Sequence, residues 1–276
     1  MVMRMEDMLA EDEGYGDITS DLLIGNEGGE SEIVANEDCV IAGLAEATEL
    51  FKGLTLDARA QVEEGCEIKK GTVVMTIHGP LKAILLGERL ALNFIMRMSG
   101  IATATSNILW DCRRTNKNVR IAATRKTTPG FRFYEKRAVT LGGGDPHRNR
   151  LDDMILIKDN HLVIVGSVTE AVNRAKAYSF SKKVEIEVVV LDQAREAARA
   201  GADIIMLDNM SPKDAEESYH AIKEIDPRII VEVSGGITPH NAAEYAKHAD
   251  VISLGWITHS AKAIQFSLSV TKVYRY

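Results

Sequence analysis

The chain has 276 residues, of which 45% are hydrophobic and 26% are charged, a balance typical of soluble globular proteins. Its formal net charge is −7 at pH 7, which argues against a broad nucleic-acid-binding surface. Apolar runs stay well short of the roughly 20 residues that span a bilayer, and the acidic N-terminal stretch is unlike a secretory signal. We therefore expect a cytoplasmic protein that binds neither nucleic acid nor a membrane.

The cysteines are odd in number and widely spaced. Cys39, Cys66 and Cys112 form no CxxC pair, so neither a disulfide framework nor a zinc site is expected. Reduced thiols that pack as small side chains are the simplest interpretation, and they fit a cytoplasmic location.

The first part of the chain predicts a small antiparallel sheet. Residues 31–44 and 58–79 alternate apolar and polar side chains, as strands with one buried face do. Gly65, Gly71 and Gly79 interrupt the second stretch and indicate tight turns.

A long helical segment is expected over residues 80–115, with an apolar face broad enough to be buried against the sheet or a second subunit. Ser99 and Gly100 mark a place where this helix would break in two. We place a domain boundary near residue 105. This gives an N-terminal domain over residues 1–105 and a second domain over residues 106–276, with the C-terminal tail free to pack back on the first.

From about residue 120 onward, short runs rich in Val and Ile alternate with helical stretches. Most runs are apolar throughout, which is typical of parallel strands covered on both faces. They cover residues 120–125, 153–159, 183–190, 203–209, 228–236 and 250–255. Apolar residues at helical spacing predict helices over residues 167–178, 191–201, 211–225 and 238–249.

Local signals mark the ends of these helices. Ser167 and Ser211 are typical N-cap residues, Pro212 and Pro239 suit a first turn, and Gly201 suits a C-terminal stop. Strand and helix alternate every 20 to 25 residues or so, which predicts a (β/α) barrel or an open doubly wound sheet.

The ends of the predicted strands favour the barrel. Polar residues or glycines stand there in one strand after another, namely Arg125, Lys158, Glu187, Asp208, Ser234 with Gly235 and Gly236, and Gly255. A β/α barrel builds its active site on this rim, whereas an open sheet concentrates such residues near one switch point. The expected fold class is therefore α/β, with a barrel as the catalytic part.

One short segment, residues 125–158, contains Arg125, Lys126, His147, Arg148 and Lys158. Positive charge gathered at one place in a chain that is acidic overall indicates a pocket for a small molecule with several negative charges. A nucleic-acid surface would show a broader positive field.

Several motifs follow one another along nearly the whole chain: YGDITSDLL, ERLALNFIMRMSGIAT, TRKTTPGFR, EKRAVTLGGG, HR, LIKDNH, EIEV, GADIIMLDNMSP, SGGIT and GWITHS. Together they resemble the quinolinate phosphoribosyltransferase family. The resemblance implies an incomplete (β/α) barrel, an N-terminal α/β sandwich domain, and a homodimer or higher homo-oligomer. It also implies an enzyme of NAD biosynthesis that uses quinolinate and phosphoribosyl pyrophosphate and forms nicotinate mononucleotide, pyrophosphate and carbon dioxide.

By the same resemblance, Arg125, His147 and Arg148 would hold the two carboxylates of quinolinate, and Arg89 would reach in from a neighbouring subunit. Guanidinium groups match carboxylates bidentately, which an ammonium group does not.

Lys126 and Lys158 would face the phosphates and the second carboxylate, again by resemblance. Glu187 and Asp208 would face the ribose hydroxyls and a Mg²⁺ ion, the implied cofactor. Carboxylates, waters and substrate phosphates form the usual Mg²⁺ shell. These four residues are the implied catalytic set.

The resemblance also implies a phosphate-binding edge made by Ser234, Gly235, Gly236, Gly255 and His259. Glycines let backbone N–H groups approach a phosphate, and the end of a following helix adds partial positive charge.

The chain departs from the family pattern at two places. Asp145-Pro146 stands where many members have Val-Asn, and Val189 stands where many have a third acidic residue. Asp145 is expected to point at Arg148 or a lysine, or away from the pocket. Three alternatives stay open: a phosphoribosyltransferase with another acceptor, a Schiff-base aldolase or phosphosugar isomerase using Lys158, and a binding protein without catalysis.

Overall fold

The computed structural model describes residues 4–275, and the chain forms two compact units. The first contains the described residues through Ser106, together with Thr128–Gly143 and the residues from Ala261 onward. The second contains Asn107–Thr127 and Gly144–Ser260. The domain boundary near residue 105 stays a prediction.

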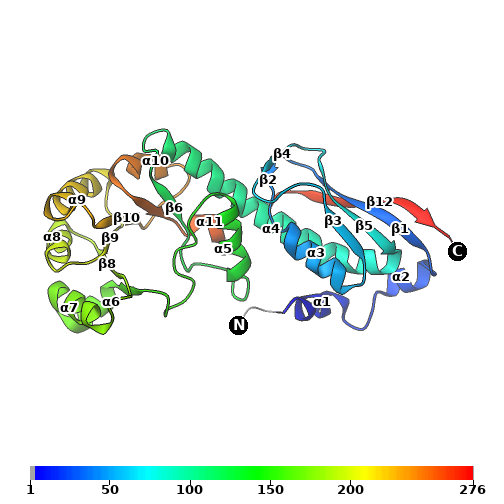
Figure 1. Cartoon of the computed structure of the whole chain (residues 1–276), viewed down its shortest axis with the longest axis horizontal. Coiled ribbons are helices and arrows are strands. Elements are labelled where there is room, and N and C mark those ends of the chain that lie inside the picture. Colours follow the sequence, from blue (N-terminus) through cyan, green and yellow to red (C-terminus); the bar gives the residue numbers. More distant parts are fainter. Residues whose placement is uncertain (1–3, 276) are drawn as a thin grey trace. The chain divides into compact units, whose positions relative to one another are not determined.

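The first unit contains two antiparallel sheets and several helices (Figure 1). Its larger sheet has the order β12-β1-β5-β3, and β2 pairs with β4. The strands are β1 (Gly28–Ala35), β2 (Cys39–Val40), β3 (Asp57–Ala60), β4 (Glu67–Ile68), β5 (Val73–Pro80) and β12 (Phe266–Tyr274). The helices are α1 (Met5–Glu13), α2 (Ile18–Leu23), α3 (Leu44–Gly53), α5 (Arg132–Leu141) and, for its residues through Ser106, α4 (Leu81–Arg113).

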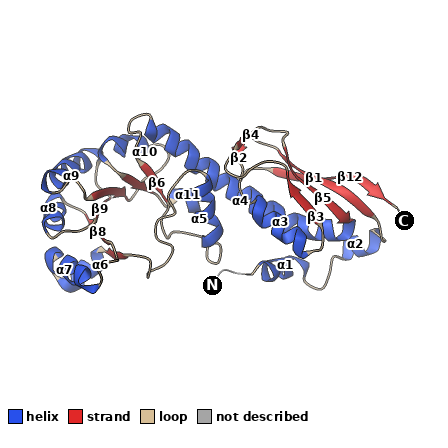
Figure 2. Cartoon of the chain, viewed as in Figure 1, coloured by secondary structure: helices blue, strands red, loops and turns tan. Residues whose placement is uncertain are grey.

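The side chains of β1 alternate between a buried and a less buried face of the larger sheet. Every second residue of β1 is buried, including Ile33, which pairs with Met75 of β5 and Leu268 of β12. The C-terminal strand β12 lies antiparallel to the whole length of β1. Helices α3 and α4 follow one face of the sheet (Figure 2), and residues from both share its apolar core. The predicted small antiparallel sheet is confirmed.

The expected break in α4 is wrong, because the helix runs without interruption from Leu81 to Arg113. Its small residues allow close packing. Ser99 Oγ donates to the carbonyl of Ala42 at 3.1 Å and accepts from the Ala42 amide at 3.0 Å. A Cβ on Gly100 would lie only 2.2 Å from the carbonyl oxygen of Lys262. Ser99 and Gly100 therefore allow other segments of the chain to pack closely against α4, and they do not break the helix.

A partly buried ion network ties α5 to the start of α3. Arg137 Nη1 donates to Glu46 Oε2 at 2.9 Å, and Arg137 Nη2 donates to Glu64. Glu64 Oε1 in turn accepts from the amides of Gly43 and Leu44 at 2.7 and 2.9 Å. Gly43 is the N-cap residue of α3 and has no side chain, so Glu64 satisfies the free amides there. Burial raises the pKa of Glu46, and the charge of Arg137 opposes that shift.

Replacing Arg137 by Met should destabilise the protein by about 3 kcal/mol, because two largely buried carboxylates lose their cation. Urea unfolding at fixed protein concentration measures the loss. The matched control is Arg59→Met, since Arg59 pairs with Asp57 at the surface, where ion pairs contribute roughly 0–1 kcal/mol. Equal small losses for both variants would contradict this account of the network.

The second unit is built on a six-stranded parallel sheet with the order β6-β11-β10-β9-β8-β7. Its strands are β6 (Arg120–Ala122), β7 (Ile155–Ile157), β8 (Val184–Val188), β9 (Ile204–Asp208), β10 (Ile230–Ser234) and β11 (Val251–Ser253). Its helices are α6 (Asp159–Val165), α7 (Val168–Tyr178), α8 (Leu191–Arg199), α9 (Pro212–Ile225), α10 (Ala242–Tyr245), the 3₁₀ helix η1 (Ala246–His248) and α11 (Trp256–His259). Figure 1 shows α7, α8 and α9 following one another outside the strands.

Within the described residues β6 and β7 do not pair with each other, so the sheet curves without closing. Asp145 forms an isolated parallel bridge to Ala122, and the segment that carries it lies beside the free edge of β6. The predicted incomplete (β/α) barrel with an N-terminal α/β sandwich is confirmed.

All six predicted strands and the first three predicted helices of this unit are confirmed. Ser167 and Ser211 accept from amides in the first turns of α7 and α9, and Pro212 is the first residue of α9. The first-turn position expected for Pro239 is wrong. The side chain of Asn241 accepts from the Thr238 amide at 2.8 Å and closes a turn, so the helix begins only at Ala242.

The thiols are free, and two of the three are buried. Cys39 and Cys112 lie in the interior, as expected, whereas Cys66 is exposed and does not serve as a packing residue. Burial raises the pKa of Cys39 to about 11. Between residues 4 and 275, the helices are all too short or too polar to cross a bilayer.

Candidate active site

A cavity of about 540 Å³ lies at the carboxyl ends of the strands of the second unit. The last residues of the strands and the loops after them form its wall. The predicted site residues in this wall are Arg125, Lys126, His147, Arg148, Lys158, Glu187, Asp208, Ser234, Gly235 and Gly236. The structure brings these residues to one cavity, and their individual roles stay predictions.

Three predicted residues are not part of this wall. Gly255 and His259 lie beside Lys126: a Cβ on Gly255 would come within 2.9 Å of Lys126 Cδ and 3.1 Å of His259 Cδ2. Arg89 is exposed on α4, in the first unit. Its contact with a neighbouring active site stays a prediction.

Lys158 and Glu187 form an ion pair across neighbouring strands. Lys158 directly follows β7, Glu187 lies on β8, and the ammonium group donates to Glu187 Oε1. The Glu187 side chain is mostly buried, whereas that of Lys158 is 42% exposed. Lys158 can therefore swing toward a ligand while Glu187 stays in the cavity wall.

His161, the last residue of the KDNH motif, contacts the backbone of its first residue. Its Nδ1 accepts a hydrogen bond from the Lys158 backbone amide at 2.9 Å, at the point where α6 begins. This contact fixes the backbone that carries the Lys158 side chain. No function was predicted for His161 from the motif.

His147 is held from both sides of its ring. Nδ1 accepts from the Arg148 amide at 2.8 Å, so Nε2 carries the hydrogen when the ring is neutral. Nε2 lies 3.2 Å from Glu232 Oε2 and 3.5 Å from Glu185 Oε2. These contacts favour a role in fixing the backbone of Arg148. The predicted contact of His147 with the dicarboxylate stays a prediction.

Asp145 stabilises the unusual backbone of His147. His147 has a positive φ of 50°, which non-glycine residues seldom adopt, and its amide donates to Asp145 Oδ1 at 2.8 Å. Asp145 Oδ2 also lies 3.4 Å from Arg120. The departure from the family pattern at this position thus serves the turn that presents His147 and Arg148. The carboxylate pairs with Arg120, a partner that sequence analysis did not consider.

Two buried glutamates at the cavity were missed by sequence analysis, and one of them, Glu232, forms part of the cavity wall. Glu185 is 0% exposed and Glu232 is 2% exposed. Both oxygens of Glu185 and Oε1 of Glu232 lack a hydrogen-bond partner within the described part of the chain. Burial, with the nearby charge of Glu232, raises the pKa of Glu185 to about 8. The raised pKa favours the neutral form of Glu185, which reduces the negative charge near the cationic rim.

The signal for these glutamates was present in the sequence. Glu185 and Glu187 are two residues apart on β8, so their side chains lie on the same face of the sheet. Glu232 is the charged residue of β10 and lies between Val231 and Val233. A charged residue in the middle of a strand covered on both faces indicates a group that points into the barrel.

The guanidinium groups of Arg125 and Arg148 experience each other's charge. Burial, followed by the charge of Arg125, lowers the pKa of Arg148. Arg125 Nε is buried and has no hydrogen-bond partner in the described structure. Such donors are costly to leave unsatisfied, and an anion between the two side chains would relieve both the repulsion and the missing bond.

The two predicted Mg²⁺ ligands are compatible with that ion. Glu187 and Asp208 come from neighbouring strands and line the same cavity. Asp208 Oδ2 accepts from Asn209 Nδ2 at 2.8 Å, which orients its carboxylate. Two carboxylates supply only part of a Mg²⁺ shell, so substrate oxygens and waters would have to complete it.

The loops that follow β9 and β10 pack closely against each other in the cavity wall. Gly235 and Gly236 both have positive φ angles, as does Asn209. A Cβ on Gly235 would lie 2.5 Å from Asn209 Cγ and 2.6 Å from the Asn209 amide nitrogen. Glycine is therefore required at position 235 for the close approach of two loops as well as for its backbone angle.

Proteins of known family match nearly the whole chain. Residues 17–99 match the family described as "Quinolinate phosphoribosyl transferase, N-terminal domain". Residues 101–269 match the family of the corresponding C-terminal domain. A protein of Archaeoglobus fulgidus named "Probable nicotinate-nucleotide pyrophosphorylase (carboxylating)" is 46% identical over 259 residues, which are 93% of this chain and 98% of the relative. The human nicotinate-nucleotide pyrophosphorylase (carboxylating) is 38% identical over 251 residues, 90% of this chain and 84% of its own.

Solved structures agree with these relatives. The crystal structure of NadC from Streptococcus pyogenes superposes with a TM-score of 0.91 at 36% identity and covers 97% of this chain and 95% of its own. The fold, the cavity and these similarities define an enzyme of the phosphoribosyltransferase class. The chain belongs to the quinolinate phosphoribosyl transferase family.

Changing Gly235 to Ala should cost about 2–4 kcal/mol of stability, since backbone strain adds to a collision with Asn209. Gly201→Ala is the matched control: Gly201 has nearly the same φ, 83° against 82°, but a Cβ there would meet no atom within 4 Å. This control should lose only about 1 kcal/mol. Denaturant unfolding of the two variants measures the difference, and equal losses would refute the steric argument.

Proposed function

We propose that the enzyme transfers phosphoribose from phosphoribosyl pyrophosphate to the ring nitrogen of quinolinate. Pyrophosphate and carbon dioxide leave, and nicotinate mononucleotide is the product, a step of NAD biosynthesis. Family membership and the names of the relatives support this reaction. The structural observation that carries it is the cavity in which two arginines and two lysines meet the carboxylates of Glu187 and Asp208.

The arginines suit the dicarboxylate. Arg125 and Arg148 offer planar donor groups, one of them with an unpaired buried nitrogen, and quinolinate has two adjacent carboxylates that need such donors. Each charge-assisted contact of this kind contributes roughly 1.5–3 kcal/mol. We assign Lys126 and Lys158 to the phosphates and the second carboxylate, because mobile ammonium groups can follow a leaving pyrophosphate.

The rim carboxylates suit the reacting ribose. As pyrophosphate leaves C1, positive charge develops on the sugar, and Glu187 and Asp208 stabilise that charge electrostatically while accepting from the ribose hydroxyls. A bound Mg²⁺ ion would neutralise part of the pyrophosphate charge. Ser234, Gly235 and Gly236 are proposed to hold the 5′-phosphate, in line with the preference of barrels for phosphates near their last strands.

Ring-nitrogen attack on C1 forms a pyridinium, and no general base is needed because that nitrogen carries no proton. The positive ring charge then stabilises the electron pair left at C2 when the adjacent carboxylate departs as carbon dioxide, and this pair takes up a proton from solvent to give nicotinate mononucleotide. Electrostatic stabilisation is thus the main task of the protein in both steps.

We further propose a homodimer or higher homo-oligomer in which Arg89 completes the dicarboxylate site of a neighbouring subunit. Arg89 is exposed, so its charge is available to another chain. Phosphoribosyl transfer is favoured over a Schiff-base reaction at Lys158, because family membership and the names of the relatives support the former. The cytoplasmic location stays a prediction.

Assay of the purified enzyme with quinolinate, phosphoribosyl pyrophosphate and Mg²⁺ tests the proposed reaction. The expected result is nicotinate mononucleotide with equal amounts of carbon dioxide and pyrophosphate. Turnover of another base with no product from quinolinate would overturn the assignment in favour of a related phosphoribosyltransferase.

Arg148→Ala should raise KM for quinolinate about ten- to a hundred-fold, the equivalent of one charge-assisted contact. Asp208→Ala should instead chiefly raise KM for phosphoribosyl pyrophosphate and the Mg²⁺ concentration required. Arg150→Ala is the control, because Arg150 is exposed and lies outside the cavity wall. Steady-state kinetics with each substrate varied separately measures the effects. Similar effects of both variants on both substrates would contradict the division of roles.

A further inference from the structure

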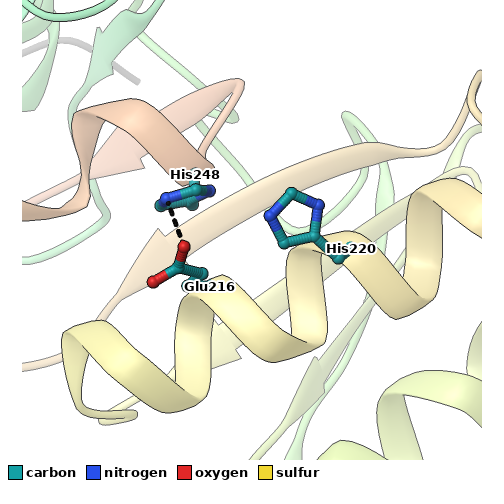
Figure 3. Close-up of side chains that lie close together, drawn as sticks. All are labelled: Glu216, His220 and His248. Carbon is teal, nitrogen blue, oxygen red and sulfur yellow. Dashed lines mark ion pairs between the residues drawn. The ribbon is translucent and has the colours of Figure 1, made fainter.

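Three potential metal ligands meet on the outside of the second unit, away from the cavity. Glu216 and His220 are four residues apart on α9, and therefore lie on the same side of that helix. His248 belongs to η1, which precedes β11. Figure 3 shows the three side chains turned toward one another from these two elements. None of them belongs to the cavity wall.

The distances between these side chains suit a shared ion. His248 Nε2 lies 3.1 Å from Glu216 Oε1, and the ring centroids of His220 and His248 are 5.2 Å apart. One ligand atom from each of the three residues lies within 4.8 Å of the other two. An ion placed among them could contact all three after small rotations of the exposed side chains.

The neighbouring residues hold His248 in place. Tyr219 packs edge-on against the rings of both His220 and His248, with centroid distances of 5.7 and 5.9 Å. Asn116 Nδ2 donates to the carbonyls of Ala246 and Ala249, which fixes the short segment that carries His248. The His248 side chain is only 12% exposed, so part of this arrangement exists before any ion binds. Ordering the ligands in advance lowers the entropic cost of binding.

We propose that Glu216, His220 and His248 form a binding site for a divalent transition-metal ion, with Zn²⁺ as the best fit, that links α9 to η1. Two imidazoles and one carboxylate are a common Zn²⁺ ligand set, and water completes the tetrahedron where only three protein ligands are present. Imidazole suits Zn²⁺, Cu²⁺ and Ni²⁺, whereas Mg²⁺ prefers oxygen ligands. The ion would therefore be distinct from any Mg²⁺ used in catalysis.

The other group of this kind in residues 4–275 is a weaker candidate. It comprises His147, Glu185 and Glu232, of which His147 and Glu232 belong to the cavity wall. The Nδ1 atom of His147 already accepts from the backbone, and the two carboxylates are almost fully buried. The site on α9 and η1 has two exposed ligands, whereas none of the three residues in the other group is exposed.

The position of the proposed site suggests a structural effect. Helix α9 precedes β10, and η1 follows it, so an ion would join the two elements that flank the strand carrying Ser234. A ligand that binds only the folded state stabilises it by mass action. We therefore expect Zn²⁺, but not Mg²⁺, to raise the unfolding temperature through this site, without any requirement for turnover.

Isothermal titration of the full-length, chelator-treated protein with Zn²⁺ tests the proposal, with thermal unfolding in Zn²⁺ or Mg²⁺ as a second measurement. The wild type should bind Zn²⁺, and His220→Gln and His248→Gln should each weaken the binding about ten-fold or more. His240→Gln is the control, since His240 is an exposed histidine of the same unit outside the group. It should bind Zn²⁺ like the wild type.

His220 is exposed, so His220→Gln should fold normally and keep its enzymatic activity, which separates loss of the metal site from misfolding. Zn²⁺ should raise the unfolding temperature of the wild type by several degrees and that of His220→Gln by much less. Equal Zn²⁺ affinity in the wild type, His220→Gln and His248→Gln would overturn the proposal. No detectable Zn²⁺ binding by the wild type would also overturn it, whatever reaction the enzyme catalyses.

Discussion

Like charges repel, and the cavity of the second unit gathers Arg125, Lys126, Arg148 and Lys158 in one wall. Carboxylates on neighbouring strands reduce the repulsion between these cations. Glu187, for example, forms an ion pair with Lys158. Substrates with several negative charges complete the balance. The order of the strands thus determines the chemistry: it brings residues that are far apart in the sequence to one edge of the sheet.

Much of this architecture could be predicted because it depends on local patterns. Apolar runs covered on both faces identified all six strands of the second unit, and the residues at their ends identified the rim. Ser167 and Ser211 marked helix starts through side-chain capping, a short-range interaction. The antiparallel sheet of the first unit followed equally from alternation with a period of two.

The rest depends on contacts between distant segments, which a single sequence does not reveal. Gly100 suggested a helix break, but it accommodates the carbonyl of Lys262, more than a hundred residues away. The sequence indicated that Glu185 and Glu232 point into the barrel, but not that both lie within 3.5 Å of the His147 ring, because that contact joins three distant segments. His220 lies on α9 and His248 on η1, and β10 separates these two elements in the sequence. The contact between the two rings therefore could not be predicted from local sequence patterns.

A crystal structure with quinolinate bound tests the central claim most directly. The account predicts the dicarboxylate in the cavity at the strand ends, with its carboxylates against the guanidinium groups of Arg125 and Arg148. Quinolinate bound elsewhere, or in the cavity with both carboxylates turned away from these arginines, would contradict it.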